Sequence, residues 1–274
     1  MQIKKAAGAL GAYVSNVDLR DIVSSDNLFA QIQALAVEHE VLFFRDQDVP
    51  PTVFQEFARR FGDVLPHLAY PLVAGTEDVQ ILESTPDNPS KIEVWHSDMT
   101  FGERPPGFTL LHGQVIPEYG GDTLWASATQ AYATLSSELQ TFFAGLTAQH
   151  DFRQGFKESL AEPGGAERLA DAVAANPPVT HPVVRTHPQT GKKSLYVNAL
   201  FTTQINELTP LESAQMLKFA YQHIVSEEHT VRLSWTPNTI AIWDNRSTQH
   251  KPVNDFFPQH RRMHRTTISG ERPV

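Results

Sequence analysis

Two short motifs that lie far apart in the chain place the strongest constraint on its fold. His96 and Asp98 stand two residues apart in a run with β-strand character at residues 94–101, and His250 follows much later in a second polar segment. In a strand, residues two apart project to the same face, so the imidazole and the carboxylate would point at one spot. If the fold brings His250 to that spot, the three side chains form a two-histidine, one-carboxylate set that suits Fe(II) and leaves open coordination positions.

Each motif also has a simpler explanation when it is taken alone, as a solvated turn, a cap or an ordinary surface histidine. Residues 260–268 change the balance, because they have the pattern of a basic strand in which Arg261 and Arg265 share parity. The two guanidinium groups would face the same side, about 13 Å apart at ~3.3 Å per residue. Buried charges need partners, and the planar fork of arginine binds a carboxylate or a sulfonate in bidentate fashion. The sequence therefore predicts anionic ligands beside the metal.

Four motifs occur in order along the chain: Trp-His-x-Asp-x-Thr-Phe at 95–101, Gly-Gly-Asp-Thr at 120–123, Trp-Asp-Asn-Arg-x-Thr-x-His at 243–250 and Arg-Arg-Met-His-Arg-x-Thr-Ile at 261–268. Together they resemble the Fe(II)/2-oxoglutarate-dependent dioxygenases of the taurine dioxygenase group, over nearly the whole chain. Within the group, the resemblance is greatest to the members that act on taurine. It implies an α+β fold whose core is a double-stranded β-helix, a cupin-like jelly roll with flanking helices, and a homo-oligomer, either a dimer or a tetramer.

The resemblance also implies a role for particular residues. Fe(II) would be held by His96, Asp98 and His250, and the distal carboxylate of 2-oxoglutarate would be held by Thr123 and Arg261. The substrate would be bound by His67, Tyr70, Phe101, Phe201 and Arg265, with Arg265 as the sulfonate anchor. With O2 and 2-oxoglutarate as cosubstrates, taurine would be hydroxylated at the carbon bearing the sulfonate, giving sulfite, aminoacetaldehyde, succinate and CO2. Taken singly, His67 and Tyr70 are more typical of surface or packing positions, and Phe201 equally suits a core.

Other functions stay open at this point. The same chemistry could act on another alkylsulfonate, a sulfate ester or an aryloxyalkanoate. One departure bears on this, because residues 91–94 read Lys-Ile-Glu-Val where the group tends to carry an Asn/Asp-rich run. If that segment contacts the amine end of the substrate, the contacts there differ. A remote alternative is a jelly roll that binds a metal or small anions without turnover. A zinc hydrolase with the same three ligands would leave both arginines unexplained.

The amino-acid composition limits the fold class and the partners that are possible. The chain has 274 residues, of which 41% are hydrophobic and 19% charged, which predicts a single globular domain over residues 1–274. A formal net charge of −9 argues against nucleic acid as the main partner. No apolar run approaches the ~20 residues of a membrane helix. The absence of cysteine excludes a disulfide framework and a thiolate metal site, and it suits a cytoplasmic location.

Periodicity and capping residues predict the elements around the motifs. Helices are expected at 24–39, from the proline pair at 50–51 to Gly62, over about 128–146 with caps at Ser127 and Ser137, and from 210 to about 225. Strands are expected at 41–44, 79–82, 108–115, 231–235, 239–243 and 260–268, with a hairpin over 183–198. His112 is expected to be structural. Poor periodicity over 151–178 predicts a partly helical, mobile lid over the active site. In the last helix, the stripe expected to face the core is Leu211, Met216, Phe219, Ala220 and Ile224.

Overall fold

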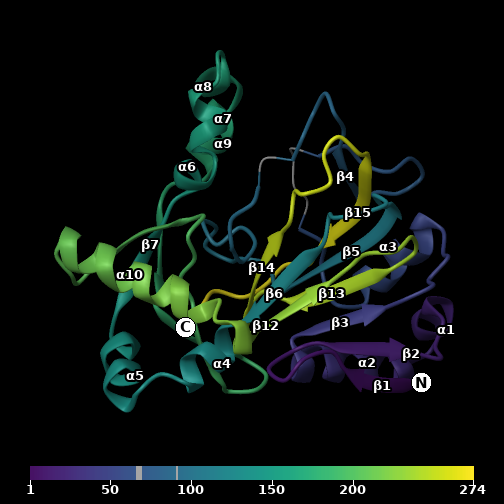
Figure 1. Cartoon of the computed structure of the whole chain (residues 1–274), viewed down its shortest axis with the longest axis horizontal. Helices are drawn as coiled ribbons and strands as arrows, with labels where there is room; N and C mark the ends of the chain where they lie inside the picture. Colours follow the sequence, from purple (N-terminus) through teal and green to yellow (C-terminus); the bar gives the residue numbers. More distant parts are fainter. Residues whose placement is uncertain (66–69, 91) are drawn as a thin grey trace.

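The computed structural model describes residues 1–65, 70–90 and 92–274. Within these ranges the strands of the core form two sheets that face each other (Figure 1). The larger sheet has seven strands among the described residues, in the order β1 (Gln2–Lys5), β2 (Ala12–Ser15), β3 (Val41–Phe44), β13 (Ile240–Asp244), β5 (Phe108–Val115), β15 (Arg261–Thr267) and β4 (Gln80–Ser84). The smaller one orders β12 (Thr230–Leu233), β6 (Thr123–Ser127) and β14 (Thr248–Pro252). This arrangement confirms the predicted α+β jelly roll.

Strand β3 shows how the larger sheet divides the core into two layers. All of its residues are buried, and alternate side chains belong to different clusters. Val41 and Phe43 point toward the smaller sheet, where Phe43 contacts the Trp125 ring at 5.3 Å between centroids. Leu42 and Phe44 point to the opposite face. The period-2 alternation of a strand thus gives the continuous apolar run two separate partners.

Three helices cover that opposite face of the larger sheet: α1 (Leu19–Ser24), α2 (Asp26–His39) and α3 (Pro51–Arg59). The sequence predicted α2 and α3, and both are confirmed. Ser25 caps α2 by accepting a hydrogen bond from the Leu28 backbone N–H. Pro51 occupies the first turn of α3, where the missing N–H costs no intrahelical bond. α2 begins two residues after the predicted start at 24, because Ser25 is its cap, and α3 begins at the predicted proline pair.

A smaller layer lies beside the two sheets. It contains the sheet of β11 (Thr202–Ile205), β7 (Thr147–His150) and β8 (Val179–Pro182), the helices α4 (Ala128–Ala133), α5 (Ser137–Ala144) and α10 (Pro210–Ile224), the 3-10 turn η1 (Glu227–His229), and the predicted hairpin of β9 (Val184–Thr186) and β10 (Lys193–Leu195). Thr209 and Glu212 form the expected capping box of α10.

The predicted lid segment contains short helices, α6 (Phe152–Gly155), α7 (Lys157–Ala161), α8 (Gly165–Arg168) and α9 (Ala170–Ala175). Figure 1 shows them as an arm that leaves the end of β7 and projects away from the two main sheets. The partly helical character is therefore confirmed, while the mobility of this segment stays a prediction.

The predicted strand at 94–101 is wrong. His96 makes an isolated bridge with His250, and the chain then turns at Asp98, where Met99 takes a φ of +46°. The backbone N–H of Asp98 is bound by the side chain of Asn245 instead of a neighbouring strand. A residue in the left-handed region breaks a strand. The side chains of His96 and Asp98 are therefore brought together by the bridge and the turn and not by the two-residue repeat of a strand.

Two smaller predictions also need correction. Ser136, not Ser137, caps α5, because its side chain accepts from the Leu139 N–H. In α10, Leu211 is 73% exposed and Phe219 is 36% exposed, so neither is a core residue. The buried positions are Ser213, Leu217, Ala220 and Ile224, which follow the helical repeat along one face. The predicted stripe therefore included residues of this buried face and residues of the exposed face beside it.

Among the described residues, no helix combines the length and the apolar character that crossing a membrane requires.

Candidate active site

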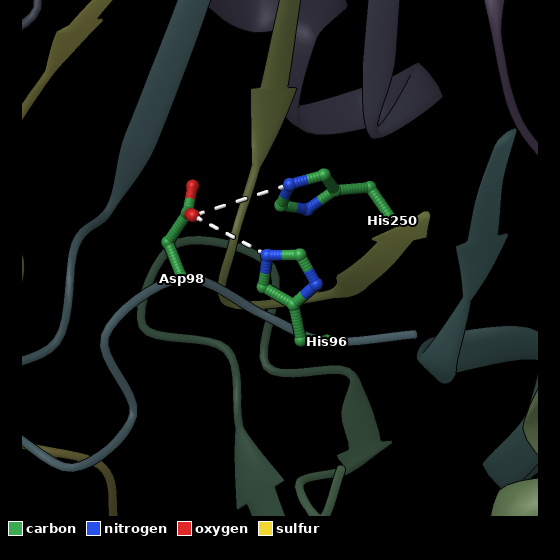
Figure 2. A group of neighbouring side chains, drawn as sticks. All are labelled: His96, Asp98 and His250. Carbon is green, nitrogen blue, oxygen red and sulfur yellow. Dashed lines mark ion pairs between the residues drawn. The ribbon is translucent and has the colours of Figure 1, made fainter. Parts of the chain in front are cut away.

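His96, Asp98 and His250 come together at one buried point (Figure 2). Each imidazole Nε2 lies 3.9 Å from Oδ1 of Asp98, and one ligand atom from each residue falls within 4.8 Å of the others. The backbone makes this convergence possible. The His96 N–H donates to the His250 carbonyl at 3.0 Å, and the His250 N–H donates back at 2.7 Å. The sequence prediction that the three residues share one site is therefore matched by their geometry.

Both imidazoles are held in the neutral form that a metal ion requires. Nδ1 of His96 donates to the Val94 carbonyl at 2.8 Å, which leaves a lone pair on the Nε2 that faces Asp98. Burial lowers the pKa of His96, and burial together with the neighbouring His96 lowers the pKa of His250 to about 3. The His250 ring packs on Trp243 at 4.7 Å between centroids. Its Nδ1 has no hydrogen-bond partner among the described residues.

Asp98 remains an anion in this setting. Burial alone would raise its pKa, but the Arg265 guanidinium and the two imidazoles outweigh burial and hold the pKa below the usual range of a carboxyl group. Arg265 Nη2 lies 2.8 Å from Oδ1, and the Thr109 hydroxyl donates to Oδ2 at 2.7 Å. Two neutral imidazole nitrogens and one carboxylate oxygen thus face a common point. This donor set fits Fe(II).

A second cationic group sits on the same strand as Arg265. Arg261 has a half-buried side chain whose Nε has no hydrogen-bond partner, and it forms no ion pair with any residue the structure describes. Burial lowers its pKa to about 10, and the nearby Asp122 offsets only part of this effect. Its guanidinium lies 5.9 Å from the centre of the Trp235 ring, and the indole N–H of Trp235 donates to the Thr123 hydroxyl at 3.0 Å. A desolvated guanidinium beside a hydroxyl can bind a carboxylate.

The Gly-Gly turn before β6 lets the side chain of Arg261 lie close to the backbone of Gly121. Gly121 has a φ of +70°, in the left-handed region that glycine tolerates at no steric cost. A Cβ at Gly121 would lie 3.3 Å from the Cδ of Arg261, tighter than ordinary contact. The Gly-Gly-Asp-Thr motif therefore leads into β6 at Thr123 and shapes the space around Arg261.

A cluster of buried aromatic rings borders the histidines. Phe101 contacts Phe152 at 5.1 Å and Phe201 at 5.0 Å between ring centroids, and Phe201 lies 6.4 Å from the His96 ring. Phe152 and the partly buried Phe156 come from the base of the helical arm. Phe101 and Phe201 are predicted from the sequence, whereas Phe152 and Phe156 are not, although their spacing of four residues on a helical segment is a usable signal.

The remaining predicted residues are placed less fully. His67 lies outside the described residues, and Tyr70 is half-buried just after that gap. His112 is structural, as predicted, because its Nε2 bonds the Gln47 carbonyl at 3.1 Å. Asn245 is likewise not predicted as a site residue, although it lies inside the motif that ends at His250. Its side-chain oxygen accepts a hydrogen bond from the Asp98 backbone N–H.

Comparison with known proteins gives consistent matches along the whole chain. A sequence model described as "Taurine catabolism dioxygenase TauD, TfdA family" matches residues 2–267. An alkylsulfatase of Acinetobacter baylyi is 36% identical over 275 residues, covering 99% of this chain and 86% of the relative. An alpha-ketoglutarate-dependent sulfate ester dioxygenase of Pseudomonas putida is 33% identical and covers 100% of this chain and 91% of its own. Among solved structures, a taurine dioxygenase from Burkholderia xenovorans superposes with a TM-score of 0.84 at 33% identity, covering 100% and 90% of the two chains.

The match to the family spans nearly the whole chain, and each of these relatives covers most of its own length as well. Alpha-ketoglutarate is another name for 2-oxoglutarate, the cosubstrate that the sequence analysis expected. The chain therefore belongs to the TauD/TfdA family and is a dioxygenase that uses Fe(II), 2-oxoglutarate and O2.

Proposed function

We propose that this enzyme couples the oxidative decarboxylation of 2-oxoglutarate to the hydroxylation of an organosulfur anion, at the carbon that carries the sulfur group. The observation that carries the proposal is a buried guanidinium, Arg265, in contact with the Asp98 oxygen that also faces both imidazoles. In this proposal His96, Asp98 and His250 hold Fe(II). When bound, the metal supplies the oxidising chemistry together with O2 and 2-oxoglutarate.

Arg261 and Thr123 are the proposed partners of the distal carboxylate of 2-oxoglutarate. The support is the Nε of Arg261, which has no hydrogen-bond partner among the described residues, together with the lowered pKa of its guanidinium, which the nearby Asp122 offsets only in part. The Thr123 hydroxyl accepts a hydrogen bond from Trp235 and keeps its own proton for a further acceptor. A carboxylate can take donors from both groups at once.

Arg265 is the proposed anchor of the sulfur group of the substrate. Its Nε has no hydrogen-bond partner among the described residues, so the guanidinium keeps a donor available beside its contact with Asp98. Phe101 and Phe201 would flank the carbon chain, with His67 and Tyr70 completing the pocket. With taurine, the substrate that the sequence predicts, hydroxylation of the sulfonate-bearing carbon breaks the C–S bond. The products are sulfite and aminoacetaldehyde, alongside succinate and CO2.

A second candidate substrate is an alkylsulfonate or an alkyl sulfate ester with an apolar chain. The aromatic cluster of Phe101, Phe152 and Phe201 favours it, because each methylene buried there would contribute about 0.8 kcal/mol. Two relatives, an alkylsulfatase and a sulfate ester dioxygenase, carry names of this substrate class. The products tell the candidates apart, since a sulfonate releases sulfite and a sulfate ester releases sulfate.

The test begins with anaerobic assembly of the enzyme with Fe(II) and 2-oxoglutarate, followed by air and one substrate at a time. Taurine, hexanesulfonate, hexyl sulfate and an aryloxyalkanoate form the panel, and succinate is measured together with sulfite and sulfate. Equal yields of succinate and sulfite from taurine support the first candidate. A much higher kcat/KM with either hexyl compound supports the second. Succinate formation only with the aryloxyalkanoate contradicts both.

Three further predictions accompany this function. We propose that residues 151–178 act as a lid, because Phe152 and Phe156 connect the arm to the cluster beside His96. We also propose a homo-oligomer, a dimer or a tetramer, which light scattering of the purified protein would test. A cytoplasmic location is the third, and fractionation of cells that express the protein would test it.

A further inference from the structure

A chain of buried polar groups ends on the oxygen of Asp98 that points away from the imidazoles. The Thr109 hydroxyl donates to Oδ2 of Asp98 at 2.7 Å, and the side-chain amide of Asn245 donates to the Thr109 oxygen at 2.8 Å. The amide oxygen of Asn245 accepts from the Trp243 indole N–H at 3.0 Å and from the Asp98 backbone N–H at 3.3 Å. None of these residues coincides with the expected ligands of 2-oxoglutarate or substrate.

The direction of every hydrogen bond in this chain is determined by groups that can only donate. An indole N–H and a backbone N–H have no lone pair, so the side chain of Asn245 must turn its oxygen toward Trp243 and Asp98. Its NH2 group then faces Thr109, and the Thr109 oxygen must accept there. A hydroxyl carries one proton, so that proton is left for Asp98.

The fold places the chain of groups where water cannot compete. Thr109 on β5 is the register partner of Trp243 on β13, and Asn245 follows β13 directly. The exposed fractions are 0% for Thr109 and 1% for both Asn245 and Trp243. Hydrogen bonds in such dry surroundings are strong and hold one arrangement.

We propose that Thr109 and Asn245 are positioning residues that set the rotation of the Asp98 carboxylate. With Oδ2 engaged by Thr109, only Oδ1 is turned toward the two imidazole nitrogens. Asp98 then presents a single oxygen to the metal ion, and coordination positions are left for 2-oxoglutarate and O2. This inference rests on the proposed role of Asp98 as a metal ligand. It adds two residues that act through Asp98 and that lie outside the sets proposed to bind 2-oxoglutarate and the substrate.

The test is Mn(II) binding to the full-length protein, measured by isothermal titration calorimetry in the absence of turnover. Thr109→Val keeps the shape of the side chain and removes the hydroxyl, and it should weaken Mn(II) binding by about 10- to 100-fold, as is typical for outer-shell partners of a ligand. Thr109→Ser restores the hydroxyl and should restore most of the affinity. Asn245→Ala leaves the Thr109 hydroxyl but frees its direction, so a smaller loss is expected.

Thr266→Val is the matched control. Thr266 is also a fully buried threonine on the neighbouring strand, but its hydroxyl has no hydrogen-bond partner among the described residues, and it has the opposite parity to Arg265. The Thr266→Val variant should bind Mn(II) with the affinity of the wild type. Circular dichroism of every variant checks that it is folded, and the visible spectrum of Co(II)-loaded protein reports the changed ligand geometry independently of affinity.

Two results would overturn the inference in distinguishable ways. If Thr109→Val and Asn245→Ala are folded and bind Mn(II) as tightly as the wild type with an unchanged Co(II) spectrum, the positioning role is wrong while the proposed function stands. If the wild type binds no Mn(II), or binds it equally well after Asp98→Ala, the metal assignment itself fails, and the positioning role fails with it.

Discussion

Two buried aspartates, Asp98 and Asp244, look alike in sequence and differ in what the fold does with them. The exposed fractions are 4% for Asp98 and 0% for Asp244, and each pairs with an arginine. Around Asp244 both oxygens are filled. Arg246 donates from Nε at 2.7 Å and from Nη2 at 2.6 Å, and the Nε2 of His187 lies 3.0 Å from the second oxygen.

Asp98 is left partly open by comparison. Thr109 binds Oδ2, while Oδ1 has one guanidinium nitrogen at 2.8 Å and the Nε2 atoms of two imidazoles at 3.9 Å. The carboxylate of Asp244 closes the turn that leads from β13 into β14, and the carboxylate of Asp98 can accept a cation. Burial and an arginine partner therefore do not by themselves identify a functional carboxylate. A functional carboxylate is identified by an oxygen whose hydrogen-bonding capacity the surrounding protein does not use up.

The largest effect that separates the two aspartates should come from Asp98→Ala. We expect iron-dependent succinate formation to fall by well over the ~100-fold typical of an outer-shell change, because one of three proposed metal ligands is removed. The protein should remain folded by circular dichroism. Turnover within about tenfold of the wild type would show that Asp98 is not a ligand.

Asp244→Asn should instead act on stability. It removes the charged partner that Arg246 holds at 2.6 Å and leaves only the half-exposed Glu271, 3.9 Å from Nη1. Breaking a buried ion pair typically costs about 3–5 kcal/mol of unfolding free energy. Urea unfolding of the metal-free protein measures this. Glu77→Gln is the control, because its pair with Arg59 is exposed and should contribute at most about 1 kcal/mol. Equal losses in both variants would contradict the structural role of Asp244.

The arginine beside Asp98 should separate from Arg261 on the same strand in a kinetic test. Arg265→Ala should raise the KM for the organosulfur substrate roughly 10- to 150-fold, the range expected for hydrogen bonds to a charged group, with little change for 2-oxoglutarate. Arg261→Ala should do the reverse. The division of labour would be wrong if both variants shifted the same KM.

The smallest expected effect is the dependence of the unfolding free energy on pH in the acid range. Burial would raise the pKa of Asp244, but Arg246 and His187 outweigh burial and lower it to about 2, so its contribution is present above its unfolded pKa near 4 and is lost only toward pH 2. Burial lowers the pKa of His112 and of His264 to about 4. Both are neutral when folded, so their contribution is present above the unfolded pKa of 6.5 and is lost as the pH falls toward 4.

Between pH 6.5 and pH 4 the unfolding free energy should therefore fall partly through His112 and His264, alongside the other buried histidines whose pKa is lowered, while Asp244 loses its contribution at lower pH. The loss contributed by His112 and His264 is the part that substitution can isolate. It should amount to a few kcal/mol, because each pKa unit corresponds to about 1.4 kcal/mol. Urea unfolding across this range measures it. The His112→Gln, His264→Gln double variant should flatten the slope, and a slope as steep as that of the wild type would contradict this account.

Much of the site could be read from local sequence. His96, Asp98 and His250 are identified by side-chain chemistry, and the parity of Arg261 and Arg265 follows from the repeat of a strand that the structure contains. The start of α3 at Pro51 follows in the same way, because a first-turn proline acts on its immediate neighbours. Such signals depend on residues a few positions apart, and the sequence states them directly.

Contacts between distant segments could not be read in this way. Residues 94–101 have strand-like composition, yet the backbone N–H of Asp98 donates to Asn245, which lies 147 positions later in the sequence and is brought near only by the fold. Phe152, at the base of the arm, likewise meets Phe101 only in the folded chain, because the two residues lie far apart in the sequence. The amino-acid sequence alone determined which groups are available for the chemistry. Only the tertiary structure decided that Asp98 is left open and Asp244 closed, because burial and hydrogen-bond saturation arise from long-range packing.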